Sequence, residues 1–270
     1  MRIIVFTDLD GTLLRYPDYS FEEALPALKK LRGKGLPLII CSSKTRREIE
    51  YYREKLKNNH PFISENGGGV FIPEGYFSGE TMDGIEGETA DGYILLRLGA
   101  RYEDLRRCVG ELREEGYKLQ GFGDMSPEDI MELTGLPEEQ AVMSKMRDFD
   151  EPFLCTDKAE KISLLFKRIK EKGYRYTKGR YFHIMGNSDK GRAVSFLVKL
   201  YRREFGDVVT VALGDSLNDL PMLKGVDYPV LVQKQDGCYE DNIVADNLIC
   251  AEGVGPAGWN RAVLTLIERI

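Results

Sequence analysis

This chain of 270 residues is poor in the residue types that build zinc sites and disulfide frameworks. It has two histidines, one tryptophan and five cysteines. The cysteines are odd in number and scattered, at Cys41, Cys108, Cys155, Cys238 and Cys250. No CxxC pair occurs, which argues against a zinc site. We therefore expect reduced thiols and a cytoplasmic protein.

Long hydrophobic runs and an excess of positive charge are also lacking. The apolar runs are far shorter than the ~20 residues that span a bilayer. Met1 is followed at once by what reads as a core strand, so we expect no signal peptide and no membrane association. The net charge of −6 gives no sign of the basic surface that nucleic-acid binding needs. Nothing in the composition indicates an oligomeric state.

Strand-like and helix-like segments alternate in residues 1–81 and 188–270. "RIIVFTDLD", "LPLIICSS" and "VVTVALGDS" are apolar without alternation, which is typical of strands covered on both faces. Segments with helical periodicity separate them. This pattern predicts an α/β fold with a doubly wound, Rossmann-like parallel sheet as its core.

The middle of the chain, residues 82–187, has a different pattern. More mixed strand candidates, "DGYILLRLG" and "YRYTKGRYFHIMG", alternate with amphipathic helices such as "YEDLRRCVGELREEG". Gly84, Gly87 and Gly92 cluster where this segment begins, and Gly186 stands where it ends. We expect an α+β domain inserted into the core, with hinges at these glycines.

Asp8 and Asp10 stand at the end of the first apolar run. Ligands of open parallel sheets bind beyond the carboxyl ends of the strands, and residues two apart on an extended chain point the same way. Two crowded carboxylates suit Mg²⁺, which takes carboxylate and phosphate oxygens. Gly11 and Thr12 would let the backbone turn close to a phosphate. The alternative is a surface turn; a calcium loop is excluded because the apolar pair 13–14 stands where oxygen ligands are needed.

Three further polar groups follow predicted strands or open a predicted helix. They are Ser42, Ser43 and Lys44 in "CSSKT", Lys190 in "NSDKG", and Asp215, Asn218 and Asp219 in "GDSLND". Hydroxyl and ammonium groups suit a phosphate, and further acids can complete a cation site. Singly, each group is typical of a helix cap, an exposed lysine or an Asp-rich turn. Together, at one edge of one predicted sheet, they favour a site for a metal and a phosphate.

These motifs carry a family resemblance. "DLDGTLL", "CSSKT", "DKG" and "GDSLND", in this order, resemble the four motifs of the haloacid dehalogenase superfamily. The segment between the second and third motifs resembles the C2-type cap of its Cof-like branch. "SENGGGVFIP" and "MRDFDEPF" are similar to segments of the mannosyl-3-phosphoglycerate phosphatases, although Asp148 and Asp150 replace the Glu and Ser usual there.

The resemblance implies roles for the residues at the strand ends. Asp8 would be the nucleophile and Asp10 the general acid and base. Mg²⁺ would be held by the carboxylates of Asp8 and Asp215 and by the backbone carbonyl of Asp10, with Asn218 and Asp219 beside the ion. Ser42 and Lys190 would bind the phosphoryl oxygens. The resemblance also suggests substrate-binding residues, namely Lys44, Glu65, Asn66, Gly67, Arg147, Arg180 and His183.

Three of these substrate-binding assignments have plain alternatives. Residues 65–67 could form only a glycine-rich turn, His183 could be a packed strand residue, and Arg147 could pair with Glu151 on a solvated helix face.

The activity implied is Mg²⁺-dependent hydrolysis of mannosyl-3-phosphoglycerate to mannosylglycerate, a compatible solute, through an aspartyl-phosphate. A broader Cof-like phosphatase acting on glucosyl-3-phosphoglycerate, hexose phosphates or sucrose phosphate is the alternative. A phospho-receiver module without enzymatic activity is disfavoured, because receiver domains lack the long insert.

Overall fold

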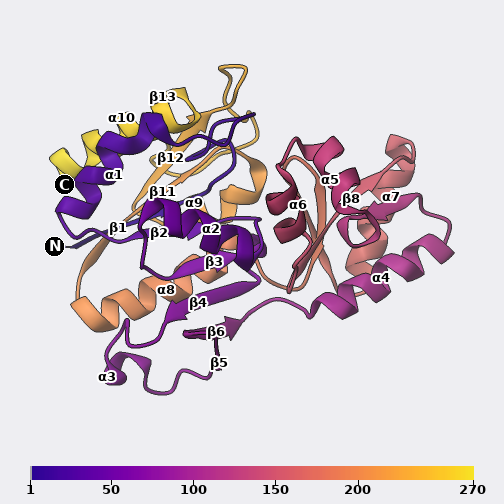
Figure 1. Cartoon of the computed structure of the whole chain (residues 1–270), viewed down its shortest axis with the longest axis horizontal. Coiled ribbons are helices and arrows are strands. Elements are labelled where there is room, and N and C mark those ends of the chain that lie inside the picture. Colours follow the sequence, from indigo (N-terminus) through magenta and orange to yellow (C-terminus); the bar gives the residue numbers. More distant parts are fainter. Residues whose placement is uncertain (1) are drawn as a thin grey trace.

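The computed structural model describes residues 2–270, and two β-sheets organise them (Figure 1). Within these residues the larger sheet has nine strands in the order β13-β12-β11-β1-β2-β3-β4-β6-β5. Its strands are β1 (Arg2–Thr7), β2 (Leu38–Cys41), β3 (Phe62–Ser64), β4 (Gly69–Pro73), β5 (Glu88–Ala90), β6 (Tyr93–Arg97), β11 (Val208–Gly214), β12 (Tyr228–Gln233) and β13 (Ile249–Val254).

The part of this sheet from β13 to β3 is parallel. β1 pairs with β11 on one side and with β2 on the other, so Thr7 lies beside both Leu213 and Ile40. Every residue of β2 and β11 is buried, as the apolar runs without alternation predict. The parallel arrangement brings the carboxyl ends of β1, β2, β3 and β11 to one edge.

Helices cover both faces of this sheet, which confirms the α/β fold. One face is covered by α1 (Leu25–Gly33), α2 (Arg46–Leu56) and α10 (Gly255–Arg269), and the other by α8 (Lys190–Phe205) and α9 (Leu220–Leu223). The short α3 (Gly79–Met82) packs against α8. Trp259 of α10 is fully buried in the first of these two apolar layers.

The second sheet is antiparallel, in the order β7-β8-β10-β9. Its strands are β7 (Leu119–Gly121), β8 (Asp150–Cys155), β9 (Arg175–Lys178) and β10 (Phe182–Met185). The helices of this part are α4 (Tyr102–Glu114), α5 (Pro127–Thr134), α6 (Glu138–Ser144) and α7 (Ala159–Glu171). α4 and α7 pack on one face of the sheet through Leu105, Leu165 and Ile184. We call residues 102–185 the cap and the rest of the described chain the core.

The start of the insert differs from the sequence prediction. β6 pairs with β4, and β5 pairs with β6, so both strands extend the large sheet. The chain therefore leaves the core only after Arg97 and not at residue 82. The expected hinge at the glycines 84, 87 and 92 therefore lies inside the core. The reason is packing, because Leu95 and Leu96 are buried in the two apolar layers of the core.

The two connections between core and cap lie against each other. A side chain on Gly186, which follows β10, would collide with the backbone nitrogen of Ala100, which precedes α4. The N- and C-termini lie far from this point, at the opposite end of the core (Figure 1). Within residues 2–270, no helix is both long enough and apolar enough to cross a membrane.

Candidate active site

A buried ionic cluster lies at the carboxyl edge of the parallel strands. Lys190, the first residue of α8, places its Nζ 2.6 Å from Asp8 Oδ1 and 2.6 Å from Asp219 Oδ1. Asp8 follows β1, and Asp219 ends the turn after β11. The Lys190 side chain is fully buried. An ammonium group with no access to water needs these carboxylates as partners.

Asp215 completes this cluster. Its Oδ1 atom accepts a hydrogen bond of 3.2 Å from the Thr12 hydroxyl. One carboxylate oxygen from each of Asp8, Asp215 and Asp219 lies within 4.8 Å of the others. Three buried carboxylates exceed the charge of the Lys190 ammonium, so further positive charge would stabilise the cluster. Oxygen ligands in this number suit a hard divalent cation.

Burial and mutual repulsion disturb the ionisation of these acids. Burial and the neighbouring carboxylates raise the pKa of Asp8 to about 7, although the Lys190 charge opposes the rise. Burial, Asp219 and Asp8 raise the pKa of Asp215 well above its usual value. Burial opposes the charge of Lys190, but its two carboxylate partners raise the pKa of the ammonium overall. A bound cation would favour the ionised carboxylates.

Gly11 gives the turn after β1 its shape. Its φ of +81° lies in the left-handed region, and a Cβ there would stand 2.6 Å from Asp215 Oδ2. Only glycine combines this backbone conformation with so close an approach. The predicted turn between Asp10 and Thr12 therefore brings the backbone directly against the acid cluster.

Asp10 lies beside the cluster and is paired with a different cation. Lys44 Nζ is 3.1 Å from Asp10 Oδ2 and 3.3 Å from Glu48 Oε1. Among the described residues, the buried Asp10 Oδ1 atom has no hydrogen-bond partner. Burial raises the pKa of Asp10, and the Lys44 charge opposes this rise. An unpaired oxygen on a carboxyl group with a raised pKa is suited to proton transfer.

A hydrogen bond from α10 holds the end of β1, the strand that precedes Asp8 and Asp10. Trp259 Nε1 donates a hydrogen bond of 2.9 Å to Thr7 Oγ1, and this hydroxyl donates one of 2.7 Å to the Asp8 carbonyl. All three residues are buried. The position of the Asp8 backbone therefore depends on the packing of α10 against the sheet, through Trp259 and Thr7.

The acids form the floor of a cavity of about 550 Å³ between core and cap. Asp8, Asp10 and Asp215 line it from the core, and Arg180, Tyr181 and His183 line it from the cap. His183 and its sheet partner Pro152 share the cap-sheet face that points into the cavity, whereas Ile184 points to the helices α4 and α7. This alternation makes the cap sheet the roof of the cavity.

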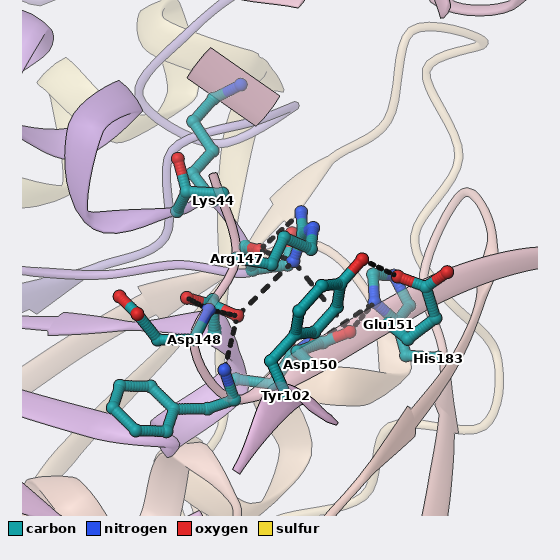
Figure 2. Close-up of polar contacts among 12 residues, drawn as sticks. Lys44, Tyr102, Arg147, Asp148, Asp150, Glu151 and His183 are labelled. Carbon is teal, nitrogen blue, oxygen red and sulfur yellow. Dashed lines mark hydrogen bonds and ion pairs between the residues drawn. The ribbon is translucent and has the colours of Figure 1, made fainter. Parts of the chain in front are cut away.

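Four of the predicted substrate-binding residues line this cavity: Lys44, Arg147, Arg180 and His183. The Arg147 side chain lies between core and cap and donates to the Ser43 carbonyl at 3.3 Å (Figure 2). It does not pair with Glu151 within the contacts of the described chain. Glu151 instead accepts hydrogen bonds from Tyr102 at 2.7 Å and from Arg106 at 2.6 Å.

Arg180 is placed by the end of α5. It donates hydrogen bonds of 3.1 Å to the Thr134 carbonyl and 3.3 Å to the Leu133 carbonyl. Its guanidinium lies 5.7 Å from the ring centre of Tyr16, a core residue next to Gly11. Arg180 thus connects cap to core and lines the cavity that also holds the acids.

The other predicted binding residues, which are residues 65–67, Ser42 and Lys190, do not line the cavity. Glu65 is fully buried and accepts hydrogen bonds from the backbone N–H groups of Asp148 and Phe149. A Cβ on Gly67 would collide with the Asp189 carbonyl, and its φ is +89°. The prediction that residues 65–67 face a sugar is thus not supported, because their polar groups are used between core and cap.

Ser42 is fully buried, and its Oγ accepts a 3.2 Å hydrogen bond from the Lys44 backbone N–H. Ser43 lines the cavity in its place.

Several cavity residues were not predicted from the sequence. They are Tyr16, Tyr19, Glu48, Phe122, Lys178 and Lys234. Two signals were available: Thr45 and Glu48 have the spacing of a capping box and form one, and Lys234 directly follows a buried strand. Tyr16 and Tyr19 stand in a loop with no regular pattern, so only the fold places them at the cavity.

Known proteins of similar sequence and fold indicate the family of this chain. The family model described as haloacid dehalogenase-like hydrolase matches residues 5–84 and 134–236. A protein of Methanococcoides burtonii named glucosyl-3-phosphoglycerate/mannosyl-3-phosphoglycerate phosphatase is 47% identical over 100% of this chain and 98% of its own length. A mannosyl-3-phosphoglycerate phosphatase of Pyrococcus furiosus is 39% identical over 85% of this chain and 90% of its own length. The fold resembles a crystal structure of a Thermoplasma acidophilum protein, with a TM-score of 0.70, 17% identity and full coverage of both chains.

Proposed function

Because this chain belongs to the haloacid dehalogenase-like hydrolases, we propose that it is a phosphatase that releases phosphate from mannosyl-3-phosphoglycerate. The glucosyl analogue is the second substrate we propose, because the Methanococcoides burtonii relative is named for both compounds. The products would be mannosylglycerate or glucosylglycerate and inorganic phosphate.

The main support from the structure is the composition of the cavity. Its floor holds Asp8 and Asp10, which can transfer a phosphoryl group and a proton, and its walls hold the cations Lys44, Arg147 and Arg180. A substrate with a phosphate and a carboxylate needs positive charge at both ends. The cavity volume of about 550 Å³ lies in the range of small-molecule sites.

We propose Mg²⁺ as the cation of the acid cluster. The donor set fits this ion, because Asp8, Asp215 and Asp219 offer carboxylate oxygens close together and carry excess negative charge. Mg²⁺ in proteins is held by one or two carboxylates, waters and substrate phosphate oxygens. When bound, it neutralises charge on the transferring phosphoryl group.

In the first step, Asp8 attacks phosphorus and the bond between phosphorus and the glycerate oxygen breaks. Lys190 holds Asp8 Oδ1, which fixes the carboxylate and leaves Oδ2 available to attack. Asp10 begins this step protonated and gives its proton to the leaving oxygen. The enzyme is left with an aspartyl-phosphate on Asp8 and an ionised Asp10.

In the second step, water attacks the phosphorus of this aspartyl-phosphate. Asp10 takes a proton from the water, the bond between the Asp8 oxygen and phosphorus breaks, and phosphate leaves. Lys44 beside Asp10 stabilises the ionised form that accepts this proton. The protein contributes mainly position and charge, as is usual for phosphoryl transfer.

Aromatic and basic residues around the acids would recognise the rest of the substrate. Tyr16 and Tyr19 pack edge to face with ring centres 5.6 Å apart and line the cavity beside Asp10. Aromatic rings offer flat apolar surface suited to the C–H faces of a sugar. We propose that the sugar ring lies against these tyrosines and that the carboxylate meets Arg180 or Arg147.

The test is a comparison of kcat/KM for mannosyl-3-phosphoglycerate, glucosyl-3-phosphoglycerate, mannose 6-phosphate and sucrose 6-phosphate, each with Mg²⁺ and with EDTA. We expect a strong preference for the two glycerate esters and loss of activity in EDTA. Asp8→Asn is the matched knock-out, because it keeps the size of the side chain and removes the nucleophile. Equal rates on the simple sugar phosphates would instead indicate a broad sugar-phosphate phosphatase. Undiminished phosphate release by Asp8→Asn would refute the nucleophile.

A further inference from the structure

A chain of buried hydrogen bonds runs from the cap to the acid cluster. His183 Nδ1 is 2.8 Å from Asp150 Oδ1. Asn66 Nδ2 donates to Asp150 Oδ2 at 2.6 Å, and Asn66 Oδ1 accepts from Asn218 Nδ2 at 3.0 Å. The Ser216 hydroxyl then donates to Asn218 Oδ1 at 2.7 Å. Figure 2 shows the cap end of this chain, where Asp150 faces His183.

Both ends of this chain lie where substrate chemistry takes place. His183 lines the cavity from the cap sheet, and Asn218 lines it from the core. Ser216 and Asn218 belong to the turn whose last residue, Asp219, holds Lys190 and accepts from the Asp215 backbone N–H at 3.1 Å. Movement of this turn would therefore move the acid cluster.

The middle of the chain requires a group that both donates and accepts a hydrogen bond. Asp150 can only accept, because His183 and Arg147 keep its pKa low in spite of its burial. Asn218 offers an N–H donor to its neighbour. A residue between them must donate on one side and accept on the other, as an Asn side chain does. Asn66 has a φ of +55°, a left-handed conformation that Asn tolerates better than most residues.

We propose that Asn66 is a positioning residue that couples closure of the cap over the substrate to the alignment of the turn 216–219. This inference rests on the proposed function, because it concerns the order of events at the same site. Asn66 does not line the cavity, and its side chain hydrogen-bonds to Asp150 on one side and to Asn218 on the other, not to the acids of the cluster. Contact of a sugar substrate with His183 would thus favour the turn geometry that holds Asp215 and Asp219.

The experiment exchanges donor and acceptor. Asn66→Asp puts two carboxylates face to face, Asp150→Asn changes the other partner, and the double variant restores one amide and one carboxylate in swapped positions. Asn58→Asp is the matched control, because Asn58 is a buried asparagine whose hydrogen-bond partners, the Leu38 carbonyl and the His60 backbone N–H, both belong to the core. Each variant is assayed with mannosyl-3-phosphoglycerate and with p-nitrophenyl phosphate, whose small leaving group does not need the cap.

For Asn66→Asp we expect kcat on the sugar ester to fall by about 10-fold or more, within the usual range of coupling between sites. We expect a change of less than about 3-fold on p-nitrophenyl phosphate. The double variant should recover most of the lost kcat. Asn58→Asp should change both substrates by the same factor. Equal losses on both substrates for Asn66→Asp, or no recovery in the double variant, would overturn the coupling.

A second readout does not depend on turnover. Hydrogen exchange is measured with Mg²⁺ and inorganic phosphate, which together occupy the acid end of the cavity. We expect slower exchange in wild-type peptides that cover residues 180–186 of the cap, loss of this protection in Asn66→Asp, and its return in the double variant. Protection that is the same in wild type and Asn66→Asp, or absent from both, contradicts the proposal. If the wild type releases no phosphate from the sugar ester while the exchange pattern holds, the proposed function fails and the coupling stands.

Discussion

The sharpest stability test concerns the ammonium at the centre of the acid cluster. Lys190→Met removes the charge and keeps an unbranched side chain of similar length. Its Nζ lies 2.6 Å from oxygens of both Asp8 and Asp219, and its side chain is fully buried. Removing one partner of a buried ion pair costs about 3–5 kcal/mol, because the partner charge is left without compensation. Here two carboxylates lose their partner, so we expect a loss of at least ~3 kcal/mol at neutral pH without metal.

Urea unfolding in EDTA measures this loss. Trp259 is the single tryptophan of the sequence and lies buried in the core, so its fluorescence reports the core and not the cap. Added Mg²⁺ should reduce the penalty, because a divalent cation can take over part of the neutralisation by binding the folded state. Lowering the pH below about 7, the raised pKa of Asp8, should reduce the penalty as well, since a protonated carboxyl group needs no cation.

Lys30→Met is the matched control, because Lys30 pairs with Glu268 at the surface. Solvent screens such a pair, and its loss should be far smaller. A loss below ~1 kcal/mol for Lys190→Met, or one no larger than that of Lys30→Met, would refute the view that the cluster depends on this buried cation.

Three further predictions concern other parts of the molecule. Gly67→Ala should lower the melting temperature more than Gly75→Ala, since both glycines have positive φ but only a Cβ on Gly67 collides with backbone, at the Asp189 carbonyl; similar melting temperatures would count against this close approach. Burial and two nearby arginines lower the pKa of His60 to about 4, so the unfolded chain binds the proton more readily and stability should fall as the pH drops from about 6.5 to about 4. His60→Gln should flatten this part of the profile in urea titrations at several pH values, and parallel profiles would speak against it. Arg180→Ala should reduce kcat/KM for mannosyl-3-phosphoglycerate by about 10-fold or more and that for p-nitrophenyl phosphate much less; equal reductions would mean that the arginine only supports the cap.

The sequence was most informative about the acids at the strand ends. Parallel strands that are buried on both faces have a recognisable pattern, and their carboxyl ends must share one edge. From this alone, Asp8, Asp10 and Asp215 could be expected together, and the structure brings them together with Asp219 and Lys190. Their catalytic roles remain predictions.

The third strand end shows where such reasoning stops. Residues 65–67 have the same signature as the other strand ends, polar residues after a buried strand. Their partners, however, are the backbone at Asp148 and Phe149 and the side chain of Asp150, which lie more than 80 residues away. Local sequence does not reveal whether a polar group faces a ligand or a distant segment of its own chain.

The predicted start of the insert at residue 82 was wrong for a related reason. β5 and β6 are short, and their sequences, ETA and YILLR, fit a strand of the core sheet and a strand of the cap equally well. The choice depends on which apolar layers accept Leu95 and Leu96, and this is a property of the assembled core. Gly84 and Gly92 lie in turns of that extension and Gly87 directly precedes β5, so these glycines do not mark the hinge.

The contact between Ala100 and Gly186 bears on how such a protein can change over time. The insert leaves and re-enters the core at one point. In the energetics of the core it therefore counts as a closed loop whose ends are already in contact. Lengthening a loop of this kind costs little entropy, and each doubling of its length adds only about 0.6 kcal/mol. A whole cap can therefore be exchanged, enlarged or replaced by a tight turn without disturbing the strands that hold the acids. Selectivity for the sugar and the chemistry of phosphate release can then evolve as separate traits, joined through the few side chains that cross between core and cap.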